Sequence, residues 1–73
     1  MLRINFCLDQ NQACSFVPII NFLIGNDVMS LEEAAVLNRK FHLGEPVVFD
    51  VPNELADKVS NELKYHNFIF QID

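Results

Sequence analysis

The chain has 73 residues, of which 51% are hydrophobic and seven are Phe, and ten Asp and Glu outnumber five Lys and Arg. This length allows one small domain over residues 1–73, and the apolar content supplies a core that needs no metal or disulfide. Binding to nucleic acid or to an anionic membrane surface requires clustered Lys and Arg. Here the basic residues are few and scattered, so neither partner is expected.

Residues 2–8 alternate between apolar and other side chains, which predicts a half-buried strand. The apolar face of this strand is formed by Leu2, Ile4, Phe6 and Leu8. Polar residues 9–12 are typical of a loop, and a helix is expected to follow with Ser15 as its cap and Pro18 in its first turn. Gly25 is expected to end this helix in a left-handed conformation.

The first predicted helix is the longest apolar run of the chain and is apolar almost all round. It is shorter than the roughly 20 residues that span a membrane, and no basic region precedes it as in a signal peptide. The residues expected to face the sheet are Val17, Ile20 and Leu23. The side chains in excess of that face are Phe16, Phe22 and Ile24. They either pack on the second helix or form an exposed apolar patch, which usually marks a partner surface.

A capping box predicts the start of a second helix at Ser30, because this side chain can accept a hydrogen bond from the N–H of Glu33. Gly44 is the expected end of that helix. The remaining predicted elements are a strand over residues 47–51, a helix over 54–65 capped by Asn53, and a strand over 68–72 whose inward side chains are Phe68, Phe70 and Ile72. This order predicts an α+β fold: a two-layer β-α-α-β-α-β sandwich with a three-stranded sheet and three helices on one face.

The residues that could carry chemistry are few and dispersed. Cys7 and Cys14 allow at most one bridge, whereas small secreted domains usually carry several, so we expect reduced thiols and a cytoplasmic location. His42 and His66 lie at two separate helix ends, without further ligands at short spacing. We therefore expect no catalytic residue, no metal site and no cofactor, and the chain is not expected to be an enzyme.

The order of elements resembles the C-terminal domain of the bacterial ribosomal stalk protein. The correspondence is closest from Val17 to Leu37, where an apolar helix ends in Gly25 and a short link precedes the helix start Leu31-Glu32-Glu33-Ala34-Ala35. A Clp-protease adaptor of the N-end-rule type shares this layout and is similar through Phe16-Val17 and through the Gly44 region after His42. The resemblance implies the fold of this superfamily over nearly the whole chain.

The departures from the stalk domain concern its binding surface. That domain presents basic residues of its first two helices to the translational GTPases. At the corresponding positions this chain has Phe16, Asn21, Ile24, Glu32 and Ala35. The resemblance therefore implies a shared fold whose helical surface is turned to a different partner.

The preferred function is a non-enzymatic protein-interaction module. Its partner-binding surface is predicted on the first helix and the start of the second, flanked by acidic groups, at Phe16, Phe22, Ile24, Met29 and Glu32. A homodimer in which two copies bury the same apolar patch is a further alternative. One alternative is a peptide adaptor in which Asp9 and the following loop hold an amino terminus. Another is an acidic inhibitor that presents carboxylates to the basic site of a host nucleic-acid or translation enzyme.

Overall fold

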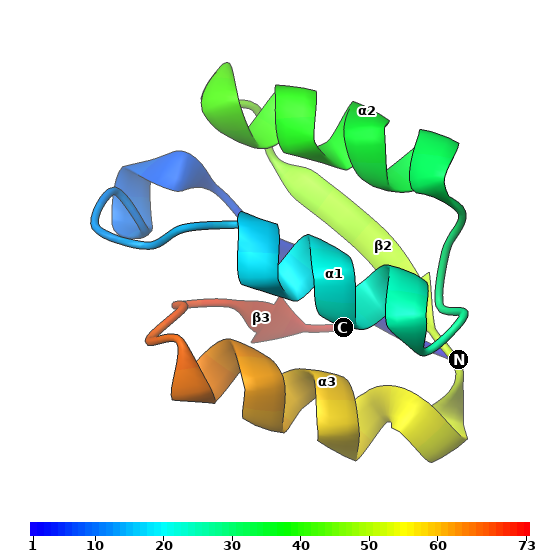
Figure 1. The fold of residues 1–73 in the computed structure, drawn as a ribbon. Coiled ribbons are helices and arrows are strands. Elements are labelled where there is room, and N and C mark those ends of the chain that lie inside the picture. The colour runs from blue at the N-terminus through cyan, green and yellow to red at the C-terminus, as the bar shows by residue number, and fades with distance from the viewer.

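The computed structural model describes all of residues 1–73 and confirms the α+β sandwich. Its elements are β1 (Leu2–Phe6), the short 3-10 helix η1 (Leu8–Gln10), α1 (Val17–Gly25), α2 (Leu31–His42), β2 (Val47–Val51), α3 (Asn53–Tyr65) and β3 (Gln71–Ile72). The sheet has the order β2-β1-β3 with antiparallel neighbours. The three helices cover one face of the sheet, with α1 between α2 and α3 (Figure 1).

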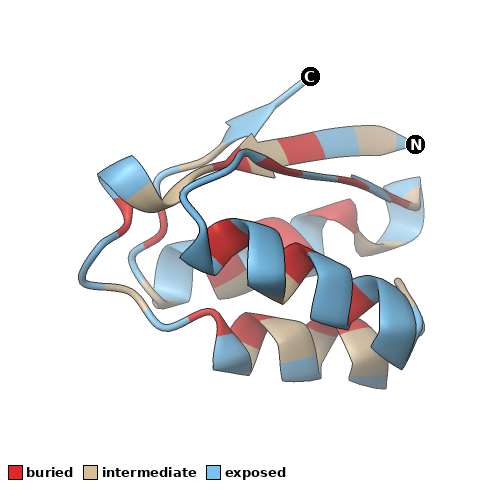
Figure 2. Cartoon of the chain, turned by 90° about the horizontal axis from the view of Figure 1, so that it is seen from above, coloured by how far each residue is buried: buried red, intermediate tan, exposed pale blue.

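One cluster of 13 buried apolar side chains fills the space between the layers. The helices turn their buried positions toward the sheet (Figure 2). The ring of Phe6 lies 5.4 Å from that of Phe16 and 5.1 Å from that of Phe68, in edge-to-face contacts. It also contacts the rings of Phe41 and Phe49. Each such pair adds about 1 kcal/mol beyond the burial of its area, so the aromatic residues fix the relative positions of the layers.

The Ser30 cap of α2 is the one helix cap at an N-terminus that the sequence predicted correctly. The backbone N–H of Glu33 donates to the Ser30 hydroxyl at 3.2 Å, and that hydroxyl lies 3.3 Å from the Glu33 carboxylate. Neither α1 nor α3 has a side-chain cap, so the capping roles predicted for Ser15 and Asn53 are wrong. Instead, Pro at the first turn of α1 and Pro before α3 start these helices through their fixed backbone angle.

All three helices end in the same left-handed turn. The residues with positive φ are Asp27 (57°), Gly44 (79°) and Asn67 (64°). In each turn the next N–H donates to a carbonyl five residues back: Val28 to Leu23, Glu45 to Lys40 and Phe68 to Leu63. This pattern is a Schellman motif, which favours Gly but accepts Asn and Asp. Gly44 was predicted correctly, whereas Gly25 is the last residue of α1 and Asp27 makes the turn.

The inner face of α1 differs from the prediction. Phe16, Ile19 and Leu23 are buried, whereas Val17 is 54% exposed and Ile20 is half-buried. The buried residues follow the helical spacing from the residue before the helix, where the Phe16 ring enters the core beside Phe6. The assignment of Phe16 to a partner-binding surface is therefore wrong, because its side chain is 1% exposed.

The last strand is shorter than predicted because the side chain of Asn11 binds the residues before it. The Ile69 N–H donates to Asn11 Oδ1 at 2.6 Å, and Asn11 Nδ2 donates to the carbonyls of Cys7 and Ile69 at 2.8 and 3.1 Å. Both backbone groups of Ile69 thus bond to a buried amide instead of to a neighbouring strand. Phe68 still points into the core, but Ile72 is 47% exposed rather than inward.

We predict that Asn11→Ala destabilises the domain by about 2 kcal/mol, since a buried polar group left unpaired costs about 1–3 kcal/mol. Urea unfolding followed by circular dichroism measures the change. The control is Gln12→Ala, an exposed position in the same loop, which should stay within about 0.5 kcal/mol of the original chain. Equal stabilities for the two variants would contradict the structural role of Asn11.

Candidate protein-binding groove

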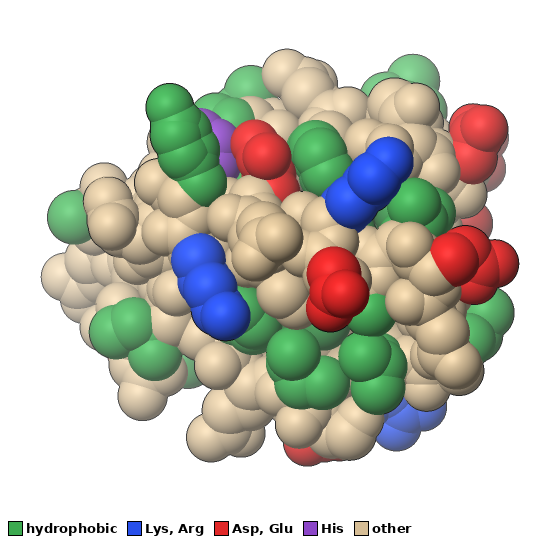
Figure 3. Space-filling model, turned by 90° about the horizontal axis from the view of Figure 1, so that it is seen from below, with side chains coloured by type: hydrophobic (Ala, Val, Ile, Leu, Met, Phe, Trp, Pro, Cys, Tyr) green, Lys and Arg blue, Asp and Glu red, His purple; other side chains and the backbone are tan.

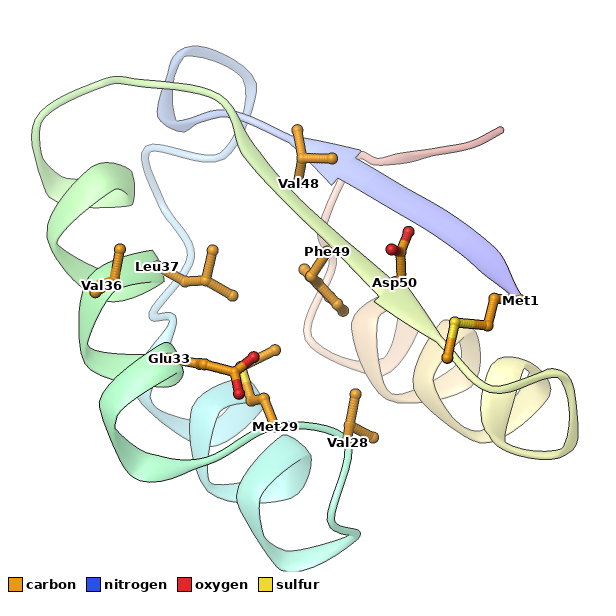
Figure 4. Close-up of a pocket in the computed structure, with 9 residues that line it drawn as sticks. All are labelled: Met1, Val28, Met29, Glu33, Val36, Leu37, Val48, Phe49 and Asp50. Carbon is orange, nitrogen blue, oxygen red and sulfur yellow. The ribbon is translucent and has the colours of Figure 1, made fainter.

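The surface hollow with the most apolar lining lies between α2 and the outer edge of β2. It has a volume of about 520 Å³, and seven of its nine lining residues are hydrophobic. The lining side chains of α2 and β2 are Glu33, Val36, Leu37, Val48, Phe49 and Asp50 (Figure 4). Its other end is formed by Met1 and, from the turn between α1 and α2, by Val28 and Met29. We call this hollow the α2–β2 groove.

The groove exists because α2 and β2 are close at one end and diverge toward the other (Figure 1). The turn at Gly44 joins the two elements over four residues, which holds them together at that end. The turn at Asp27 and the cap at Ser30 set the start of α2 at the opposite, wider end. There the half-buried Val28 and Met29 pack against the core without closing the space.

The groove has a buried floor and exposed apolar walls. Leu37 and Phe49 on the floor are only 9% and 8% exposed. Val36 of α2 and Val48 of β2 keep 48% and 45% of their surface exposed. Single exposed Val residues are ordinary on protein surfaces, but these two line the same hollow. Such continuity of apolar surface is a feature of binding sites.

The pairing of the strands shows which backbone groups of β2 face outward. The Asp73 N–H donates to the carbonyl of Arg3 at 2.8 Å, so the backbone of Arg3 faces β3. Both backbone groups of a residue in an antiparallel strand point to the same side, and the side alternates along the strand. The β1 residues that face β2 are therefore Leu2, Ile4 and Phe6, and their partners are Val51, Phe49 and Val47.

It follows that the backbone groups of Val48 and Asp50 face the outer edge of the sheet. β2 is an edge strand, and none of the turn, loop or side-chain hydrogen bonds reaches either residue's backbone. Two N–H donors and two carbonyl acceptors are thus available to another chain along the groove. An edge of this kind is a template for pairing with an extended segment.

The charges at the groove are acidic. Glu33 and Asp50 are its only lining residues with charged side chains. Asp50 Oδ1 accepts from Arg3 Nε at 3.2 Å, and both side chains are at least half exposed. An exposed pair of this kind contributes about 0–1 kcal/mol, so it leaves the Asp50 carboxylate able to receive a second cation.

The structure separates the residues that were predicted to form one surface. Met29 lines the groove, whereas Glu32 is exposed on the first turn of α2 outside the lining. Phe22 and Ile24 are half-buried on α1, and Phe22 packs against the core.

Sequence reasoning missed two wall residues, Val36 and Val48. The sequence feature that could have identified them is an apolar residue at a position where the periodicity of the helix or strand predicts a polar one. Val48 stands on the outer face of a strand with strict alternation, and Val36 lies beside the buried stripe of α2.

The other candidate residues lie apart from the groove. Asp9 is exposed in η1 at a smaller hollow of about 340 Å³, which also includes the amides of Asn5, Gln10 and Gln71. His66 contacts Glu62 at 3.2 Å. No three His, Cys, Asp or Glu side chains converge as metal ligands would. On the side of the molecule where α3 lies, basic and acidic side chains are interspersed with apolar ones rather than gathered by sign (Figure 3).

No family model, curated protein or solved structure matches this chain. None of its helices combines the length and the apolar character that crossing a bilayer takes.

Native-state hydrogen exchange should distinguish the two sides of β2. We predict that the amide of Phe49, bonded to β1, exchanges on the order of a hundredfold more slowly than the amides of Val48 and Asp50. NMR spectra of the labelled chain after transfer to D₂O measure the three rates. Equal protection of Phe49 and Val48 would contradict the outer edge described above.

Proposed function

We propose that this protein is a non-enzymatic interaction module that binds a partner protein in the α2–β2 groove. The observation that carries the proposal is the pair of half-exposed walls, Val36 and Val48, over a hollow of about 520 Å³. Covering the exposed half of each Val contributes about 1 kcal/mol. Met29 extends the apolar surface, and Glu32 belongs to its acidic surroundings.

The resemblance to the ribosomal stalk domain enters as part of the proposal. In that family the first two helices present basic residues to the translational GTPases. Here the predicted flank on α1 is Phe22 and Ile24, and the start of α2 carries Glu32 and Glu33. We therefore propose a shared fold with a partner of opposite charge. We also propose a cytoplasmic location, which the two free thiols support.

The double variant Val36→Lys, Val48→Lys is expected to lose the partner, because two cations replace the apolar walls. Both positions are half exposed, so the variant should stay folded. Val17→Lys is the matched control, since Val17 is equally exposed but lies on α1 outside the groove. Affinity purification of the three chains from source cells, followed by mass spectrometry, compares their partners. A partner that still co-purifies with the folded double variant would contradict the proposal.

A second candidate function is favoured by the surroundings of Asp9. Its exposed carboxylate and three nearby amide side chains offer oxygen acceptors to a peptide's amino terminus. This arrangement supports the peptide-adaptor function, in which Asp9 and the following loop hold an amino terminus.

The adaptor reading predicts that binding depends on a free amine and on Asp9. A peptide with a free amino terminus should bind at least about tenfold more tightly than its acetylated form, as expected for a charge-assisted hydrogen bond of about 1.5–3 kcal/mol. Isothermal titration calorimetry with both peptides, on the original chain and on Asp9→Asn, measures the difference. Equal affinities for the free and acetylated peptides would remove this function.

A further inference from the structure

We infer that the partner segment binds as an added fourth strand, antiparallel to the outer edge of β2, with its alternate side chains in the α2–β2 groove. This inference rests on the proposed function and names the chemistry of the partner. The occupant is an extended segment of another protein that alternates apolar residues with Arg or Lys.

The backbone of β2 sets the register of such a strand. The residues opposite Val48 and Asp50 exchange hydrogen bonds with them, because these two β2 residues direct their N–H and carbonyl groups outward. Directly opposed residues of an antiparallel pair project their side chains to the same face. A partner residue opposite Phe49 therefore shares the inner face and enters the groove beside Leu37.

The charged side chains at the groove determine which residue types fit the partner positions on either side of the one opposite Phe49. A partner residue opposite Asp50 lies on the outer face of the sheet, beside the Asp50 carboxylate. Asp50 and Glu33 carry the only charged side chains of the lining, and both are acidic. Opposite charges at facing positions stabilise a strand pair, so Arg or Lys fits there.

The β2 edge is a better template than the other edge of the sheet. β3 has only two residues, whereas β2 has five. Proteins usually protect edges with Lys, Pro, bulges or short strands. Between its flanking prolines β2 reads Val-Val-Phe-Asp-Val and pairs with β1 in an unbroken register. Its one charge, Asp50, favours a basic partner.

A second copy of the chain fits this edge less well. Pairing β2 with β2 would bring a second Glu33 and a second Asp50 to the same interface. Each copy also carries a formal net charge of −5. Like charges brought together in one interface disfavour the pairing of two copies.

The probe is the blocked peptide acetyl-Thr-Val-Arg-Val-Arg-Val-Thr-amide, added to the labelled full chain and followed by NMR. The central valine lies opposite Phe49, and the two arginines lie opposite Val48 and Asp50. We expect saturable shifts at the groove and at least tenfold slower exchange of the Val48 and Asp50 amides. The blocked amino terminus prevents capture at Asp9.

Two methylated peptides test the strand geometry. Methylating the backbone nitrogens of the two arginines removes the donors that face β2 and should weaken binding at least tenfold. Methylating the central valine nitrogen, which points away from β2, should change binding less than threefold. The peptide with glutamates in place of both arginines should bind at least tenfold more weakly than the arginine peptide.

Each contrary outcome has a separate meaning. Equal weakening by the two methylations would overturn strand addition. Failure of the probe to bind, while the partner is lost from the Val36→Lys, Val48→Lys variant, would overturn strand addition and leave the groove as the binding site. Dimers in analytical ultracentrifugation with protected Val48 and Asp50 amides would assign the edge to a second copy instead. A partner retained by that double variant would overturn the proposed function itself.

Discussion

The ring of Phe6 contacts the rings of Phe16, Phe41, Phe49 and Phe68, which come from four other segments of the chain. One residue of the central strand thus ties β2, the start of α1, the end of α2 and the residues after α3 to a common point. Aromatic pairs have preferred geometries as well as large buried areas. The angle between α2 and β2, and hence the groove, depends on this arrangement because Phe41 and Phe49 are held by the same ring.

The turns at the helix ends complete the positioning that the aromatic residues begin. Each Schellman turn reverses the chain within two residues and directs the following side chain. After α3 the turn at Asn67 delivers Phe68 to the core. After α1 the turn at Asp27 delivers Val28 to the groove. The same type of turn therefore positions a core residue after α3 and a residue of the candidate site after α1.

The sequence predicted the fold class because periodicity and capping are local. The alternation of residues 47–51 and the Ser30 box were read correctly. The burial of Phe16 was missed because it depends on where α1 begins relative to the sheet. The length of β3 was missed because the backbone of Ile69 forms its hydrogen bonds with the side chain of Asn11, which lies 58 residues earlier in the sequence. The groove was found only in part, through Met29, because it lies between elements whose angle is set by tertiary packing.

Val36 and Val48 add little to the core, since about half of each side chain is exposed. Val17 is equally exposed, so exposure alone distinguishes nothing. What sets Val36 and Val48 apart is that they share a hollow with the unpaired backbone of an edge strand. An apolar edge invites pairing with any extended chain. In the proposed strand addition, the acidic side chain of Asp50 on the outer face of that edge fits a basic segment. Strand addition, as proposed, would use both features: the open edge for the backbone of the partner and the acidic group for its side chains.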